Sequence, residues 1–193
     1  KMKSVVVIVF AFFISACGTT YQVPAQNNGL LPWGEAKVNQ LKPSSIEVNT
    51  PHKNLEEVKF IVLLSGGNHK TKEFKEFSRK AVDLIGFKNI LTHTEYVRLI
   101  INNRLDDKIE AKYDLLSLHK AYKELGNFLV ISMYSNNLGG AWFEMGITVT
   151  DPKSSETLLK VSKESVVWAN MDTEFSYPIV NVLNDWKNNS IHK

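Results

Sequence analysis

Hydrophobic residues recur along most of this chain with the periods of strands and helices. Residues 58–64 are apolar on both faces and end at two glycines, which predicts a central strand covered on both sides. From Phe74 to Ile85 the apolar residues recur at three- and four-residue steps, which predicts an amphipathic helix that Gly86 ends. A short strand at residues 89–92 follows, so this strand-helix-strand order predicts a right-handed parallel crossover.

The remaining pattern predicts two further helices, three strands and a closing helix. Their ranges are residues 97–105, 115–125, 128–135, 141–150, 157–168 and 175–186. The predicted order is therefore β-α-β-α-α-β-β-β-α. This order predicts the α/β (α+β) class, with a two-layer mixed sheet of about five strands and helices mainly on one face.

The N-terminus differs in composition from the rest of the chain. Residues 5–14 are all apolar, and this block is too short for a membrane-spanning helix, which needs about 20 residues. Lys1 and Lys3 lie before the block, and a basic segment followed by about ten apolar residues is typical of an export signal.

The four residues after this block decide the type of signal. Ile14-Ser15-Ala16-Cys17 resembles the lipobox of bacterial lipoproteins, in which the cysteine is acylated and the preceding segment is removed. The resemblance implies a signal peptide at residues 1–16 and a lipid anchor on Cys17, strong enough for stable membrane attachment because it carries several acyl chains. The alternative is an ordinary cleaved secretory signal. In Gram-negative lipoproteins an aspartate after the cysteine favours the inner membrane, so Gly18 implies the outer membrane, facing the periplasm.

The segment after the cysteine predicts a flexible tether. From residue 17 to residue 55 no hydrophobic period persists, and four of the six prolines lie there among polar residues. We therefore expect a lipidated tether at residues 17–55 and a single α/β domain at residues 56–193. Without residues 1–16 the chain keeps 21 Lys plus Arg against 20 Asp plus Glu, a balance that gives no nucleic-acid-binding footprint.

Two stretches resemble a small α/β domain of bacterial envelope proteins. Residues 121–131 (AYKELGNFLVI) are similar to its helix end and following strand, and residues 149–158 (VTDPKSSETL) are similar to its recurrent hairpin. This domain occurs in the curli-secretion lipoproteins, in lipoprotein activators of penicillin-binding proteins and at the amino terminus of the Tol-system translocation protein. The resemblance implies this fold for residues 57–189, and by analogy a partner in the cell envelope.

Few residues are placed for catalysis or for metal binding. Residues 65–71 (SGGNHKT) join a strand to a helix, but their spacing is not that of a phosphate-binding loop. Ser65 with His69 is a weak nucleophile candidate, because the surrounding residues are not a nucleophile elbow. The five histidines have no metal-ligand spacing, so we predict no catalytic residue, no metal and no cofactor.

The strongest candidate for binding is the hairpin after residue 128. If residues 136–140 form the loop, Tyr134 lies opposite Trp142 and Glu144 lies opposite Ser132, all on one face. The alternate residues from Phe143 to Val149 then point into the core. Tyr134, Trp142 and Glu144 are therefore our candidate protein-binding face, unless the tether or the closing helix covers it.

These features favour a non-enzymatic, membrane-anchored periplasmic lipoprotein whose domain binds or regulates another envelope protein. The alternatives are a subunit of an oligomeric secretion or envelope-assembly apparatus, and a periplasmic hydrolase. A hydrolase predicts a pocket at residues 65–70, whereas a binding module predicts an apolar patch around Trp142.

Overall fold

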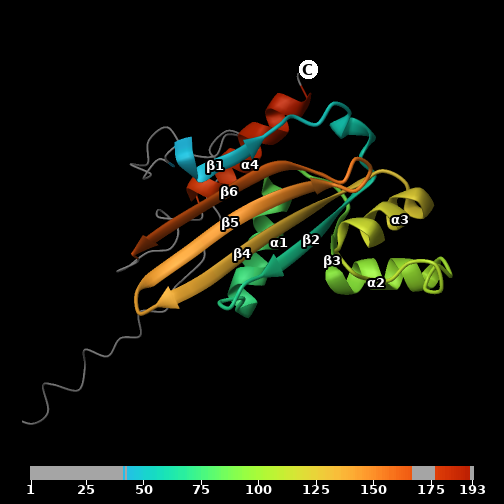
Figure 1. The fold of residues 1–193 in the computed structure, drawn as a ribbon, viewed down its shortest axis with the longest axis horizontal. Helices are drawn as coiled ribbons and strands as arrows, with labels where there is room; N and C mark the ends of the chain where they lie inside the picture. The colour runs from blue at the N-terminus through green and yellow to red at the C-terminus, as the bar shows by residue number, and fades with distance from the viewer. Residues whose placement is uncertain (1–40, 42, 167–176, 192–193) are drawn as a thin grey trace, which may run out of the picture.

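The fold is a six-stranded mixed sheet with four α-helices (Figure 1). The computed structural model describes residue 41, residues 43–166 and residues 177–191. The strands are β1 (Ile46–Asn49), β2 (Phe60–Gly66), β3 (Ile90–Thr92), β4 (Phe128–Gly139), β5 (Trp142–Asp151) and β6 (Glu156–Val166). The helices are α1 (Lys72–Leu84), α2 (His93–Asn102), α3 (Leu115–Leu125) and α4 (Tyr177–Ile191), with short 3-10 helices η2 (Pro43–Ser45) and η3 (Leu55–Glu57).

The predicted class and element order are confirmed, with β1 as an additional strand. The strands lie in the order β1-β6-β5-β4-β2-β3. β2 pairs in parallel with both β3 and β4, whereas all other neighbours are antiparallel. None of the helices in the described part of the chain has the length and hydrophobicity that crossing a bilayer requires.

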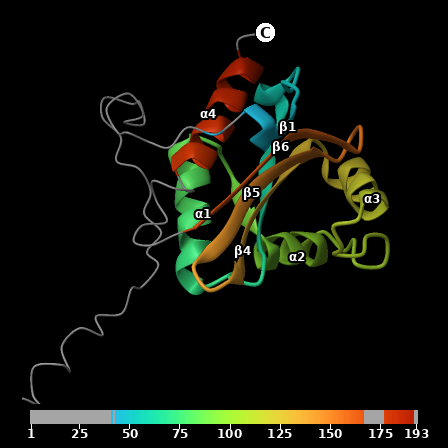
Figure 2. The same ribbon diagram turned by 60° about the vertical axis from the view of Figure 1, so that its left-hand side comes forward.

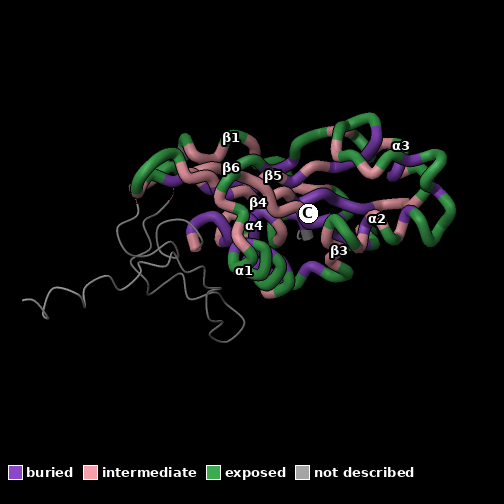
Figure 3. Tube along the Cα trace, turned by 90° about the horizontal axis from the view of Figure 1, so that it is seen from below, coloured by how far each residue is buried: buried purple, intermediate pink, exposed green. Residues whose placement is uncertain are grey.

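The central strand β2 is buried on both faces, as its sequence predicts. Ile61 and Leu63 pack into one hydrophobic core with α1 and α4. Phe60 and Val62 point the other way, into a second core with α2 and α3. In Figure 3 the buried residues therefore run along the strands, between helices whose outer surfaces are exposed.

The helices lie on two faces of the sheet, where the sequence predicted mainly one. Figure 2 shows α1 and α4 on one side, and α2 and α3 on the other. The second pair covers only the half of the sheet near β2, because β4 changes character along its length. Phe128 and Val130 join the second core, whereas Ser132 and Tyr134, on the same face, are only partly buried.

Part of the predicted tether belongs to the domain. Residues 46–49 form β1, which pairs with β6, and Leu55 is buried in the first core. The Nε1 of Trp186 on α4 donates a 2.8 Å hydrogen bond to the carbonyl oxygen of Thr50, and α4 thereby holds this segment. The domain thus begins before residue 56. Ile46 and Val48 alternate with polar residues, but two such positions give too short a pattern to predict a strand.

The signal peptide, Cys17, and the tether up to residue 40 lie outside the described residues. All described residues of both hydrophobic cores come after residue 40. A chain that begins at residue 18 therefore keeps all of these described core residues.

We predict that Trp186→Phe destabilises the domain by about 1–3 kcal/mol, because the Thr50 carbonyl loses its donor. Urea unfolding measures this change, and hydrogen exchange of the β1 amides should accelerate. Trp142→Phe is the matched control at an exposed tryptophan and should change stability by less than about 0.5 kcal/mol. Equal stabilities of the two variants would contradict the anchoring role of Trp186.

Candidate functional site

On one face of the antiparallel half of the sheet, the described residues place no helix. On β4, β5 and β6 it carries the side chains that point away from α1 and α4. We call this surface the outer face; its residues are Tyr134, Asn136, Trp142, Glu144, Thr148, Lys160, Ser162 and Glu164. α4 packs on the opposite face, through Ile179 and Leu183, so the closing helix does not cover the outer face.

The predicted hairpin register is wrong, but the predicted facing of its side chains is right. Tyr134 lies opposite Gly146 instead of Trp142, and Glu144 lies opposite Asn136 instead of Ser132. Strand β4 extends through the two asparagines that the sequence analysis placed in the loop, and the chain turns at Gly139 and Gly140. Each partner moves by four positions, and an even shift keeps every side chain on its face.

Three polar side chains at the centre of the outer face form a hydrogen-bonded group in which two of them donate to the third. The Tyr134 hydroxyl donates to Glu144 Oε1 at 2.9 Å, and Asn136 Nδ2 donates to Glu144 Oε2 at 3.0 Å. The Tyr134 ring lies across Gly146, where a Cβ would come within 2.6 Å of the ring. Glycine at this position therefore lets the tyrosine lie flat on the sheet and reach Glu144.

The tip of the β4–β5 hairpin is apolar and exposed. Trp142 has 47% of its surface exposed and Leu138 has 50%. Leu138 is the extra residue where the register shifts next to the turn. Figure 1 shows this hairpin reaching past the end of β2, while β6 runs beside β5 as far as Val166, opposite Trp142. The hairpin tip, defined as Leu138 and Trp142, is thus continuous with the polar outer face.

A second candidate site lies where β2 and β3 end. The chain leaves β2 toward α1 on one face of the sheet and leaves β3 toward α2 on the other. Adjacent parallel strands whose connections diverge in this way leave a crevice at their carboxyl ends, where open α/β sheets commonly bind ligands. Here the crevice has a volume of about 850 Å³. Its lining includes Leu63, Leu64, Ser65, Lys70, Lys75, Arg79, Lys80, His93, Tyr113 and Ser132.

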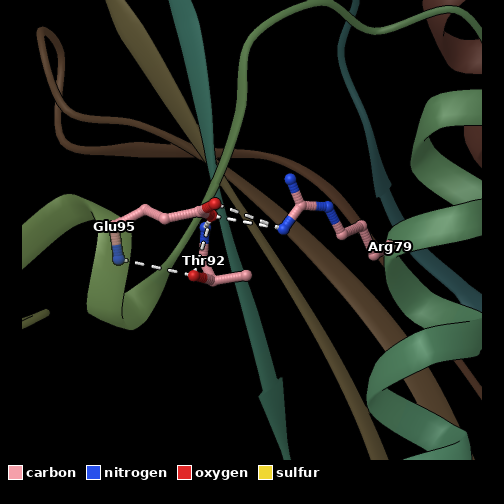
Figure 4. Close-up of polar contacts among 3 residues, drawn as sticks. All are labelled: Arg79, Thr92 and Glu95. Carbon is pink, nitrogen blue, oxygen red and sulfur yellow. Dashed lines mark hydrogen bonds and ion pairs between the residues drawn. The ribbon is translucent and has the colours of Figure 1, made fainter.

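An ion pair joins the two helices beside the crevice (Figure 4). Arg79 Nη1 on α1 lies 3.3 Å from Glu95 Oε2 on α2. The same carboxylate accepts hydrogen bonds from the backbone nitrogen of Thr92 at 2.7 Å and from its hydroxyl at 2.8 Å. Thr92 and Glu95 thus form a capping box at the start of α2.

These contacts favour the charged form of Glu95. The hydrogen bonds from Thr92, first from its backbone and then from its hydroxyl, together with Arg79, hold the Glu95 pKa below its ordinary value of 4.5. A carboxyl group with a lowered pKa stabilises the folded state at neutral pH and loses that contribution as the pH falls through its folded pKa. Acid therefore weakens the Arg79–Glu95 ion pair that links α1 and α2.

The loop that ends β2 is fixed against the hairpin and does not form an anion cradle. A Cβ on Gly67, whose φ is +95°, would lie 2.0 Å from the carbonyl oxygen of Ser135. The backbone nitrogens of Asn68 and His69 donate to Asn136 Oδ1 and to the Ser135 carbonyl oxygen, at 3.0 Å each. These amides already have acceptors within the protein and are therefore not available to an anion. The role of Gly67 is to permit close packing of the loop on β4.

The predicted serine–histidine candidate is divided between different surroundings. Ser65 lines the crevice, whereas the His69 ring packs edge-on against Phe143 with centroids 5.2 Å apart. The crevice contains His93 instead, whose Nδ1 lies 2.5 Å from the Tyr113 hydroxyl. In the described part of the chain no group of three or more His, Cys, Asp or Glu could hold a metal ion.

The crevice includes Ser65 and Lys70, within the segment where the hydrolase alternative predicted a pocket, but its walls on α1 and α2 were not predicted. Arg79, Lys75 and Lys80 lie on the exposed face of an amphipathic helix, which is an ordinary place for such charges. The Thr-x-x-Glu spacing from Thr92 to Glu95 was a readable signal for the start of α2. This helix start, together with the predicted end of the strand before it, would have located the edge of the sheet where β2 and β3 end.

No protein-family model matches this chain, and no curated protein matches its sequence. Among solved structures it is similar to the LpoB C-terminal domain from Salmonella enterica, with 7% identity and a TM-score of 0.39 over 63% of this chain and 87% of that one. It is also similar to the PelC dodecamer from Paraburkholderia phytofirmans, with 9% identity and a TM-score of 0.42 over 72% and 93%. Lipoprotein GNA1162 from Neisseria meningitidis has 12% identity and a TM-score of 0.37 over 69% and 96%.

The predicted resemblance to the α/β domain of bacterial envelope lipoproteins is thus found again among solved structures. At these identities and TM-scores the likeness is one of fold.

We predict that three tyrosines of the folded protein ionise at a higher pH than a free tyrosine does. Burial raises the pKa of Tyr96, Tyr113 and Tyr134 to about 12 each, and at Tyr134 the bond to Glu144 adds to the rise. Because the unfolded chain ionises near pH 10, folding stability should fall as the pH rises from 10 to 12. Absorbance of tyrosinate against pH measures the titration, and Tyr134→Phe should remove one late phenol. Ionisation of all phenols near pH 10 in the folded state would contradict the assignment.

Proposed function

We propose that this protein is an outer-membrane lipoprotein, anchored through Cys17 and facing the periplasm. Its α/β domain binds another envelope protein and catalyses no reaction. The lipobox at residues 14–17 and the preceding basic and apolar segments support the anchor. The exposed hairpin tip beside the polar outer face supports the binding role.

The hairpin tip is the single observation that carries the binding role. A large aromatic side chain with an aliphatic neighbour, both about half exposed, is the type of residue pair that dominates interface energies once a partner covers it. Beside the hairpin tip, the Tyr134 hydroxyl and the Asn136 amide each hold the Glu144 carboxylate by a hydrogen bond. These side chains are already ordered before binding. Covering them with a partner therefore costs less side-chain conformational entropy.

The surroundings of Ser65 and His69 support a role without catalysis. His69 packs on Phe143, and its backbone nitrogen serves the hairpin, so both tie this residue to the structure of the loop. Ser65 is paired with Met133 in the parallel ladder of β2 and β4. These contacts account for both residues without a reaction.

We predict that the chain incorporates an alkyne-labelled palmitate when produced in a Gram-negative host, and that the mature protein lacks residues 1–16. Cys17→Ser should abolish the label and cleavage before residue 17, because the thiol accepts the acyl group. Gly18→Asp is the matched variant: it should keep the label but move the protein from outer-membrane to inner-membrane fractions. Labelling of Cys17→Ser would sink the anchor proposal.

We predict that Trp142→Ser weakens partner binding by about 30-fold or more, the effect of losing one interface hot spot of about 2 kcal/mol. The partner is first captured by a photo-crosslinking residue at position 142 of the anchored protein and identified by mass. Its affinity for residues 18–193 is then measured by titration calorimetry.

Leu116→Ser is the matched control, since Leu116 is 64% exposed but lies on α3, away from the hairpin. It should leave the affinity unchanged. Equal losses in both variants would refute the hairpin tip as the contact. If the crosslinked partner is a second copy and light scattering shows a multimer, the domain is an assembly subunit and binding of a different protein is wrong.

A further inference from the structure

We propose that the crevice at the carboxyl ends of β2 and β3 binds a small organic anion with an apolar or ring-shaped body. This site is separate from the outer face and goes beyond the proposed protein binding. Its cationic wall would hold the acidic group, and its apolar floor would hold the body.

The shape of the crevice fits a small ligand. Its volume of about 850 Å³ is within the range of about 300–1,000 Å³ usual for ligand pockets. Leu63 and Leu64 on β2, with Tyr113, supply apolar and aromatic surface. The Arg79–Glu95 ion pair bridges α1 and α2 beside the crevice.

The charge of the crevice is unbalanced in favour of cations. Lys70, Lys75, Arg79 and Lys80 line it, against one lining carboxylate, that of Glu76. Arg79 is paired with Glu95, and Glu76 lies 3.7 Å from the ammonium group of Lys72. Among the described residues no ion pair engages the other three lining lysines. An acidic ligand would therefore meet ammonium groups that need not leave an existing partner.

The start of α2 adds to this field. His93 and Thr94, the first two residues of the ten-residue helix, line the crevice. The amino-terminal end of a helix carries partial positive charge, which the Glu95 carboxylate of the capping box balances in part and which favours an anion nearby. Cations from α1 and from the loop at residue 70 therefore act together with α2 from different sides of the same cavity.

The test compares two fluorescent probes that share their rings and differ in charge. Anilinonaphthalene sulfonate carries an anionic sulfonate, whereas N-phenylnaphthylamine lacks it. We expect residues 18–193 to bind the sulfonate at least about ten-fold more tightly, with an affinity that falls as salt is added, because charge attraction is screened. Equal affinities for the two probes would overturn the anion preference.

Charge reversal locates the site. Lys75→Glu with Lys80→Glu should weaken sulfonate binding about ten-fold or more, while far-ultraviolet circular dichroism and thermal unfolding check that the domain is folded. Lys53→Glu with Lys120→Glu is the matched control, since it makes the same change in net charge at exposed lysines outside the crevice. If both double variants lose sulfonate affinity equally, the loss is due to net charge alone, and the proposed site is overturned.

Two further arms separate other sources of the signal. Trp142→Ala should leave sulfonate binding unchanged, and its loss would place the probe at the hairpin tip and overturn the crevice site. In nuclear magnetic resonance spectra the probe should shift the amide signals of Ser65 and Thr94.

A phospholipid headgroup has the same anionic chemistry, so vesicles of phosphatidylglycerol are added as competitor. Displacement of the probe supports the site with a lipid source, and no displacement supports it with a free anion.

Discussion

The structure depends on the burial of β2 on both of its faces. A strand whose successive side chains are all apolar must have a core on each side, and here Ile61 belongs to one core and Val62 to the other. The chain meets this demand by sending the connection after β2 over one face and the connection after β3 over the other. The crevice follows from that choice, because the two connections part at the edge where both strands end.

The same constraint explains why none of the four described α-helices covers the outer face. The second core needs to cover only β2 and its immediate neighbours, so α2 and α3 extend no further along β4 than Val130. From Ser132 on, this face of β4 turns polar, and β5 and β6 continue it with Glu144 and Lys160. A sheet with one solvated face must alternate polar and apolar residues, which is the pattern of β5.

Strand patterns made most of the fold predictable, and particular residues show where prediction stopped. The alternation from Phe143 to Val149 fixed the facing of β5 even though the loop position was wrong, since a shift by an even number of residues leaves facing unchanged. β1 was missed because only Ile46 and Val48 carry its pattern, and pairing with β6 supplies the rest. Of the crevice only the segment at residues 65–70 was named beforehand, because the residues of its other walls are far apart in sequence and each has an ordinary local role.

The two candidate sites are mechanically joined through one loop. The Asn68 side chain donates to the Asn137 carbonyl oxygen at 2.9 Å and accepts from the Asn137 nitrogen at 2.6 Å. This loop begins directly after the end of β2, which forms part of the crevice, and it is bonded to the strand that leads to the hairpin tip. Gly67 permits contact so close that even a methyl group there would separate the loop from β4. The hairpin is therefore held at a fixed position relative to the crevice.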